Sequence, residues 1–285
     1  MNRPKTLVLL DGADPTETRT VKERIGFLDG QTTNPTLVSR NPRIRELLQS
    51  GHKLSEPEER DEYRKIATEI SRIIGHAGVS IEVYADRTTT AEDMLDQAKD
   101  MYYWIPNAYI KYPCTTEGLK AAEVSVERGL RVNMTLCFSQ SQIAAAYAAT
   151  KRAKTAVYVS PFVGRLDDIG QNGMDLTKNA KRMLATSDGH VSVLASSIRS
   201  VEQLLYCFFL EADLVTAPAK ILLAWAEREL PLPPDNFQYQ SAGRAIEYQE
   251  LDLNQPWQSY DISNQLTLKG IDKFAKDYHE VAESS

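Results

Sequence analysis

The stretch AYIKYPCTTEGLKAAEVSVERGLRVNMTLC, residues 108–137, predicts a strand, a helix and a second strand in turn. Its first run, AYIKYP, and its last, RVNMTLC, are short and strand-like. The segment between them, EGLKAAEVSVERGL, has the longer apolar period of an amphipathic helix. Two strands joined through a helix predict a parallel pair. Because most of the chain repeats this alternation, the unit indicates the fold class of the whole protein.

Similar short runs raise the number of predicted strands to eight. The others are TLVLLDG from Thr6, GFLDGQTTN from Gly26, VSIEVYA from Val79, TAVYVSPF from Thr155, HVSVLASS from His190 and ADLVTAP from Ala212. Eight strands that alternate with helices are the number that closes a (β/α)8 barrel. We therefore expect an α/β protein with one TIM barrel, and the length of 285 residues suits a single domain over residues 1–285.

Helix starts are indicated by a hydroxyl residue followed three positions later by Glu or Gln. The pairs are Thr89 with Glu92, Ser139 with Gln142, and Ser200 with Gln203. Each pair comes just after a predicted strand, where a strand-to-helix connection is required.

Two segments do not follow the alternation. The charged residues 50–75 predict a helix added after the second strand. Residues 230–261 are rich in Pro, Gln, Asn and Asp and predict an irregular insertion, although its aromatic residues indicate that it packs against the rest. A terminal helix is predicted around residues 269–282.

The composition narrows the class of protein. Hydrophobic residues make up 42% and charged residues 25%, as in a globular protein, and the net charge of -6 argues against nucleic-acid binding. Cys114, Cys137 and Cys207 lack metal-binding or disulfide spacing, so we expect reduced thiols in the cytoplasm and neither a metal nor a cofactor. No apolar run approaches the length of about 20 residues that spans a bilayer.

Lys111 is the residue that the strand pattern explains least well. Side chains alternate along a strand, so the apolar positions face the outer helices and the polar positions face the barrel interior. This places Lys111, Glu82, Asn133 and Thr135 together near the barrel mouth. A single inward lysine is also explained by a salt bridge. A cluster of buried polar groups costs stability, so we favour a chemical role.

The residue types of this cluster define the chemistry. A lysine in a partly apolar site loses its proton more easily, and the neutral amine can attack a ketone to form a Schiff base. Glu82, Thr135 and Asp11 can supply acid and base groups.

Further polar residues are expected at the carboxyl rim of the barrel, where barrel active sites lie. Asp11 ends the first strand and Asn34 lies in TTNP after the second, although each also fits an ordinary turn. The loops after the sixth and seventh strands contribute the pairs Ser160 with Arg165 and Ser197 with Arg199. Two arginines at one rim suit a phosphate, but a loop arginine can also be solvated.

Taken together, seven motifs resemble the transaldolase family. They are LDG at 10–12, TTNP at 32–35, SIEV at 80–83, IKYP at 110–113, NMTLCFS at 133–139, SPFVGRLDDIG at 160–170 and ASSIR at 195–199. They occur in the family's order from residue 6 to about residue 225, and LTLKGIDKFAKDY near the end resembles the tail of the short transaldolases.

The resemblance implies transfer of a dihydroxyacetone unit from fructose 6-phosphate or sedoheptulose 7-phosphate to an aldose phosphate, in the pentose phosphate pathway. The implied roles are Lys111 as Schiff-base lysine, Asp11 as acid/base, Glu82 and Thr135 holding a proton-relaying water, Asn34, Asn133, Thr32 and Ser197 binding the sugar, and Ser160, Arg165 and Arg199 binding its phosphate.

Two positions bear on the type of reaction. A related branch that only cleaves fructose 6-phosphate resembles this chain but carries Gln in place of Glu82 and Tyr in place of Phe162, so both positions match the transferring type. Tyr112, Cys114 and Ile198 depart from the family pattern. The alternatives are an aldolase for a related sugar and a catalytically silent binding homologue. The sequence leaves open a homo-oligomer, the preferred acceptor and the role of the insertions.

Overall fold

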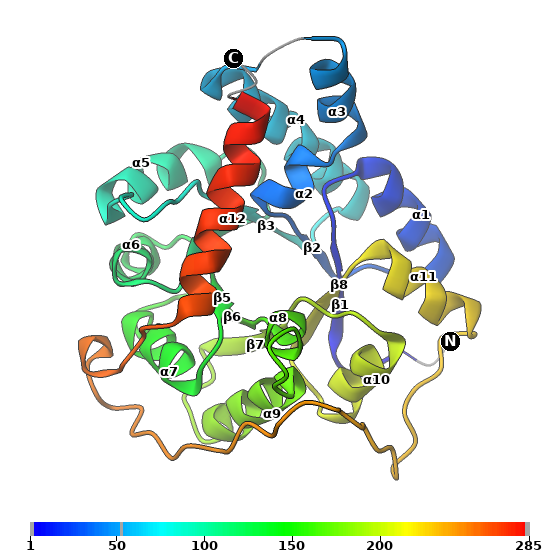
Figure 1. The fold of residues 1–285 in the computed structure, drawn as a ribbon, viewed down its shortest axis with the longest axis vertical. Helices are drawn as coiled ribbons and strands as arrows, with labels where there is room; N and C mark the ends of the chain where they lie inside the picture. The colour runs from blue at the N-terminus through cyan, green and yellow to red at the C-terminus, as the bar shows by residue number, and fades with distance from the viewer. Residues whose placement is uncertain (1–2, 52–53, 283–285) are drawn as a thin grey trace.

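A closed barrel of eight parallel strands, hydrogen-bonded in chain order, forms the centre of the molecule (Figure 1). The computed structural model describes residues 3–51 and 54–282. The strands are β1 (Leu7–Asp11), β2 (Gly30–Thr32), β3 (Gly78–Glu82), β4 (Ala108–Pro113), β5 (Val132–Cys137), β6 (Val157–Pro161), β7 (Val191–Ala195) and β8 (Leu214–Ala217). The predicted (β/α)8 fold is confirmed, although the second strand has only three residues.

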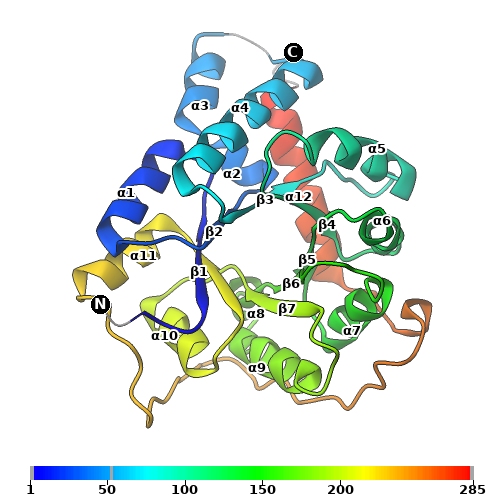
Figure 2. The same cartoon turned by 180° about the vertical axis from the view of Figure 1, so that it is seen from behind.

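Helices surround this barrel on all sides, as the view from behind shows (Figure 2). They are α1 (Pro15–Ile25), α2 (Pro35–Ser39), α3 (Pro42–Gln49), α4 (Glu56–Ile74), α5 (Ala91–Met101), α6 (Thr116–Glu127), α7 (Gln140–Ala149), α8 (Val163–Asp167), α9 (Gly173–Leu184), α10 (Val201–Phe209), α11 (Ala219–Glu227) and α12 (Gln265–Ala282), with a short 3-10 helix η1 (Trp257–Ser259). The outward strand faces, such as Val79 and Ile81 of β3, are fully buried beneath them.

Residues 50–75 and 230–261, the two segments outside the strand–helix alternation, have the predicted secondary structure. Helix α4 is the added helix after β2, and the chain from residue 230 to α12 is irregular except for η1. This irregular segment follows the outside of the barrel past α9 and α7 (Figure 1). The Asn179 side chain donates to the Ile246 carbonyl at 2.8 Å, and Gln140 donates to the Glu247 carbonyl at 3.0 Å. The predicted packing of the insertion is therefore confirmed.

The predicted helix starts are right in two cases and wrong in one. Ser139 and Ser200 are N-caps, but Gln142 and Gln203 do not close a capping box. Their side chains accept from the backbone N–H of Phe138 and of Arg199, the residues that precede the two N-caps. The prediction for Thr89 is displaced by one residue. Thr90 forms the capping box there with Asp93, because Thr89 instead donates to Asp86 at 2.8 Å.

The terminal helix α12 crosses the carboxyl face of the barrel (Figure 1). It begins four residues before the predicted start, at Gln265. The Thr267 hydroxyl donates to the Leu136 carbonyl at 2.9 Å, and the Thr36 hydroxyl of α2 donates to Asp277. These contacts fix α12 across the end of the barrel where the predicted active site lies.

Candidate active site

Lys111 lies near the middle of β4 and points into the barrel, where only 3% of its surface is exposed. Its ammonium is 2.8 Å from Glu82 Oε2 and donates to the Thr33 carbonyl at 2.9 Å. The strand register pairs Glu82 with Lys111, so the two side chains leave neighbouring strands at the same height. Lys111 and Glu82 of the predicted cluster are thus in contact. The ion pair between them is also what the alternative explanation, a lysine buried by a salt bridge, requires.

Burial controls the acidity of the two carboxyl groups near this lysine. Desolvation raises the pKa of Glu82, although Lys111 and Arg165 oppose the shift. Desolvation also raises the pKa of Asp11, against the charge of Lys111 and the hydrogen bond from Thr32. Both carboxyl groups therefore bind protons more readily than exposed ones.

The polar side chains of β5 and β6 extend the cluster. The Asn133 amide donates to Ser80 Oγ at 3.1 Å, and Ser160 donates to Asn133 Oδ1 at 2.7 Å. Thr135 is completely buried, and its hydroxyl has no hydrogen-bond partner among the described residues. A buried hydroxyl without a partner is costly, so Thr135 differs from the satisfied groups around it.

Asp11 and Thr32 form a second group, at the ends of β1 and β2. The Thr32 hydroxyl lies 2.7 Å from Asp11 Oδ1 and 2.7 Å from the hydroxyl of Thr216. Asn34 caps α2, because its side chain accepts from the Leu37 N–H at 2.9 Å, and its remaining amide group borders the site.

These groups border a cavity of about 300 Å³ at the barrel mouth, hereafter the mouth cavity. Its predicted lining residues are Asp11, Thr32, Asn34, Lys111, Ser160, Phe162, Arg165, Ser197 and Arg199. The other three predicted site residues, Glu82, Asn133 and Thr135, are buried beside Lys111 and Ser160 and do not line it. Nine of the twelve predicted residues therefore line the mouth cavity, and the other three are buried in the barrel interior.

Arg165 is the least exposed of the three arginines that line the mouth cavity. Its guanidinium lies between two rings, 5.3 Å from the centre of Phe162 and 5.2 Å from that of Phe274. None of the ion pairs formed by the described residues includes Arg165. A Cβ at Gly270 of α12 would lie 2.6 Å from this guanidinium, so glycine leaves room for it. Burial lowers the pKa of Arg165 from its ordinary value, while Glu82 opposes that shift.

Arg199 is held differently. It makes a two-pronged ion pair with Asp168, with distances of 2.5 and 2.7 Å, on the exposed side of the mouth. A Cβ at Gly164 would lie 2.3 Å from Arg199 Nε, and Ser197 adopts a left-handed φ of 60°. The backbone of both loops is therefore shaped to hold Arg199 beside the cavity.

Several lining residues escaped the sequence analysis. They are Thr36, Leu37, Arg40, Ser196, Thr216, Lys273 and Phe274. Strand alternation alone could have identified Thr216, which lies two residues after Leu214 on the inner face of β8. No comparable signal exists for Arg40 or Lys273, because helices α2 and α12 bring them to the mouth.

The residues that depart from the family pattern lie away from the reacting groups. Tyr112 points outward and hydrogen-bonds Ser125 at 2.8 Å, and Cys114 is buried against the Gln142 carbonyl. Ile198 is also buried, and none of the three lines the mouth cavity. Their substitution therefore changes the packing around the site and leaves its lining intact.

Among the described residues, no three His, Cys, Asp or Glu side chains gather so that they could hold a metal ion. No helix in residues 3–51 or 54–282 is long and apolar enough to cross a membrane.

A closed parallel barrel with an ion-paired lysine inside and arginines at its carboxyl rim is the arrangement of a TIM-barrel enzyme, whose active site lies at that rim. The family model described as Transaldolase/Fructose-6-phosphate aldolase matches residues 8–285. The chain therefore belongs to the transaldolase/fructose-6-phosphate aldolase family, and it is an enzyme of the transaldolase or aldolase type.

Individual relatives agree with this assignment. A "Probable transaldolase" of Lactiplantibacillus plantarum is 37% identical over 211 residues, which are 73% of this chain and 84% of that protein. Another, of Bacteroides thetaiotaomicron, is 39% identical over 194 residues, covering 68% and 78% of the two chains. A third, of Paracoccus denitrificans, is 35% identical over 221 residues, covering 78% and 89%.

Proposed function

We propose that this enzyme is a transaldolase that moves a dihydroxyacetone unit from fructose 6-phosphate or sedoheptulose 7-phosphate to an aldose phosphate. The observation that carries the proposal is the buried Lys111–Glu82 pair beside a cavity lined with arginine. The proposal places the reaction in the pentose phosphate pathway, and the three buried free cysteines suit the reducing cytoplasm.

The first step requires an uncharged amine on Lys111. Glu82, 2.8 Å away, can accept the ammonium proton, and its raised pKa favours this transfer. The amine then attacks the ketone carbon of the donor, and loss of water gives the imine. Thr135 and Glu82 would hold the water that carries protons in this step, which agrees with the unpartnered Thr135 hydroxyl.

Cleavage of the donor follows from the position of Asp11. Its carboxylate would take the proton of the C4 hydroxyl as the C3–C4 bond breaks, and the bonding electrons move into the imine to give an enamine on Lys111. An aldose phosphate leaves and another enters. The enamine carbon attacks the new aldehyde, Asp11 returns its proton to the new hydroxyl, and water releases the longer ketose.

Sugar phosphate recognition is assigned to the cationic side of the mouth. Arg165 and Ser160 would contact the phosphate, with Arg199 beside them, because guanidinium groups bind phosphate through paired hydrogen bonds. The structure adds Arg40 and Lys273 to this side as candidates for the same anion. Asn34, Thr32, Asn133 and Ser197 would bind the sugar hydroxyls and the imine.

Transfer is favoured over simple cleavage by two side chains. Glu82 is a carboxyl group paired with Lys111, and Phe162 presents a ring without a hydroxyl to the cavity. The cleaving branch carries Gln and Tyr at these positions. A site without an extra tyrosine hydroxyl offers one proton donor fewer to the enamine, so the enamine would survive until an aldose arrives.

The deciding experiment traps the imine. The protein is incubated with fructose 6-phosphate, reduced with borohydride and mapped by peptide mass. A dihydroxyacetone-sized adduct on Lys111 is expected, and its absence from folded protein would refute the imine mechanism for this donor.

Product analysis then separates transfer from cleavage. With erythrose 4-phosphate as acceptor, sedoheptulose 7-phosphate should form faster than free dihydroxyacetone. Free dihydroxyacetone as the main product, with or without acceptor, would instead identify an aldolase.

A further inference from the structure

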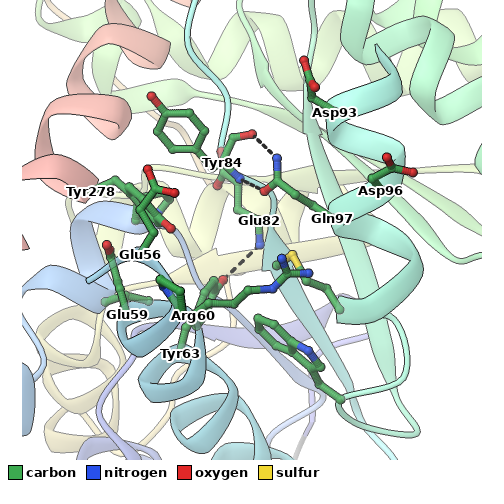
Figure 3. A pocket seen from close by; sticks show the side chains of 15 residues that line it. Glu56, Glu59, Arg60, Tyr63, Glu82, Tyr84, Asp93, Asp96, Gln97 and Tyr278 are labelled. Atoms are coloured by element: carbon green, nitrogen blue, oxygen red, sulfur yellow. Dashed lines mark hydrogen bonds between the residues drawn. The ribbon is translucent and has the colours of Figure 1, made fainter. Parts of the chain in front are cut away.

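A second cavity lies outside the barrel, between α4, α5 and the end of α12 (Figure 3). Its volume of about 460 Å³ exceeds that of the mouth cavity. We call it the outer cavity. It is a different cavity from the mouth cavity, because Lys111, Arg165 and Arg199 line only the mouth cavity, although Glu82, the ion-pair partner of Lys111, lines the outer one.

The outer cavity is strongly acidic. Glu56 and Glu59 border it from α4, and Asp93 and Asp96 from α5 (Figure 3). Among the described residues that line it, Arg60 is the only cation, and it forms an ion pair with Asp100 at 3.0 Å. Asp93 accepts from Thr90 and Asp96 from Lys99, so these two carboxylates have partners of their own. Thr90 and Lys99 do not pair with Glu56 or Glu59.

A structural role does not explain why the carboxyl group of Glu59 is buried. Only 3% of its surface is exposed, and its Oε2 atom is buried without a hydrogen-bond partner among the described residues. Burial raises the pKa of Glu59 to about 8, and the nearby Glu56 adds to the shift. A buried carboxyl without a partner destabilises the fold, so a leucine or glutamine would serve packing better. A bound cation would remove the cost.

The other walls of the cavity are aromatic or apolar. Tyr63, Tyr84, Trp104 and Tyr278 surround the space, and Met101 lies beside Trp104 in the lining. Tyr278 lies next to Glu56 and Glu59 (Figure 3). Aromatic faces attract organic cations and also bury the apolar part of a ligand. The cavity thus combines a carboxyl group with several rings, the features that recognise an amine attached to an apolar body.

We propose that the outer cavity binds a small organic ammonium ion. The ammonium group would donate to the Glu59 carboxylate beside Glu56 and Tyr278, and the apolar body would lie against Trp104 and Met101. A cavity of this volume lies within the range of small-molecule sites.

The test uses 2-phenylethylamine as the probe and the full-length protein, with binding followed by calorimetry. Two probes of nearly equal shape serve as controls: 2-phenylethanol, which is neutral, and phenylacetate, which is anionic. We expect saturable binding of the amine, with the alcohol and the acid at least about tenfold weaker, because their groups leave the buried carboxyl unpaired or repel it. Equal affinity for amine and alcohol, or no saturable binding of the amine, would overturn the proposal without any variant being needed.

Two variants locate the probe. Glu59→Gln keeps the size of the side chain and should weaken amine binding by about tenfold or more. Glu227→Gln, an exposed glutamate of α11 outside the lining of the cavity, should leave the affinity unchanged. Thermal unfolding of both variants confirms that they are folded. Unchanged amine affinity in folded Glu59→Gln would show that the amine binds elsewhere and would end the proposal.

Discussion

The two ends of the barrel interior differ sharply, although the same strands build both. At the amino end, Leu9, Leu194 and Leu214 form a small apolar cluster with Tyr158 packed against it. The Tyr158 ring stacks on Tyr109 at 4.3 Å between ring centres. At the carboxyl end the interior is filled by charged and hydrogen-bonded side chains.

Four of the eight strands, β1, β4, β6 and β8, change from an apolar or aromatic to a polar inward residue within two positions. Leu9 is followed by Asp11, Tyr109 by Lys111, Tyr158 by Ser160, and Leu214 by Thr216. Positions two apart point to the same side of a strand, so both members of each pair face the interior. The apolar member adds stability through burial, while the polar member lines the mouth cavity, where buried polar groups cost stability. The comparison shows that a single strand can carry both a stabilising residue and a residue that lines the mouth cavity, only two positions apart.

The strongest test of this comparison is Lys111→Met. We expect kcat to fall by about four orders of magnitude or more, because the proposed imine forms on Lys111, and Lys273, the other described lysine that lines the mouth cavity, is ion-paired with Asp277. Release of glyceraldehyde 3-phosphate from fructose 6-phosphate, in the presence of acceptor, measures the effect. Lys120→Met, at an exposed lysine paired with Glu117, should behave like the wild type. Substantial activity in Lys111→Met would refute the assignment of the lysine.

The apolar end is tested by Leu214→Ala. The free energy of unfolding should fall by about 2–5 kcal/mol, because the change leaves a cavity in the packed amino end. Leu7→Ala is the matched control. Leu7 pairs with Leu214 in the strand register but is 42% exposed, so its loss should change stability by about 0.5 kcal/mol or less. Denaturant unfolding measures both. Equal effects of the two changes would show that the amino end is not a stabilising cluster.

Arg165→Gln tests whether the carboxyl end recognises phosphate. The KM for fructose 6-phosphate should rise roughly 10- to 100-fold, since a charged hydrogen-bond partner is lost. The KM for unphosphorylated fructose should change little. Arg152→Gln, at an arginine whose side chain is 78% exposed, is the control. If both donors were affected alike, Arg165 would hold the sugar or the fold and not the phosphate.

The smallest expected effect is a shift in pH dependence. Asp11 must be ionised to accept a proton, so kcat/KM should fall as the pH drops through its raised pKa. The hydrogen bond from Thr32 favours the ionised form. Thr32→Val should therefore raise the pKa further and move the acidic limb upward by about half to one pH unit. Thr216→Val, which removes a hydroxyl that does not contact Asp11, should move it less. An unmoved limb would assign it to another group, such as Glu82.

Strand alternation predicted the interior of the site well, because it needs only the period of two and the closure of the barrel. Lys111, Glu82, Asn133 and Thr135 were placed together in this way, and the register of β3 to β5 agrees. The same rule could have found Thr216. Helix starts were less certain, since Thr89 and Thr90 are equivalent by residue type and only the contact with Asp86 separates them.

Residues carried to the site by docked helices could not be predicted. Lys273 and Phe274 reach the mouth only because α12 crosses the barrel, a position fixed by contacts such as Thr267 with Leu136. The burial of Glu59 could not be predicted either. Its sequence neighbours are charged, so nothing in the local pattern indicates that packing of α4 against the end of α12 and α5 buries it.

Because α12 is the last helix of the chain, the ribosome makes it after every strand of the barrel. Every barrel strand precedes α12 in the chain, so the ribosome completes all eight strands before it delivers Lys273 and Phe274. A growing chain therefore carries Lys111 in a barrel whose mouth still lacks one wall and whose Arg165 lacks one of its two rings. The wall of the mouth cavity that α12 supplies is therefore completed last, after the strands of the barrel have been synthesised.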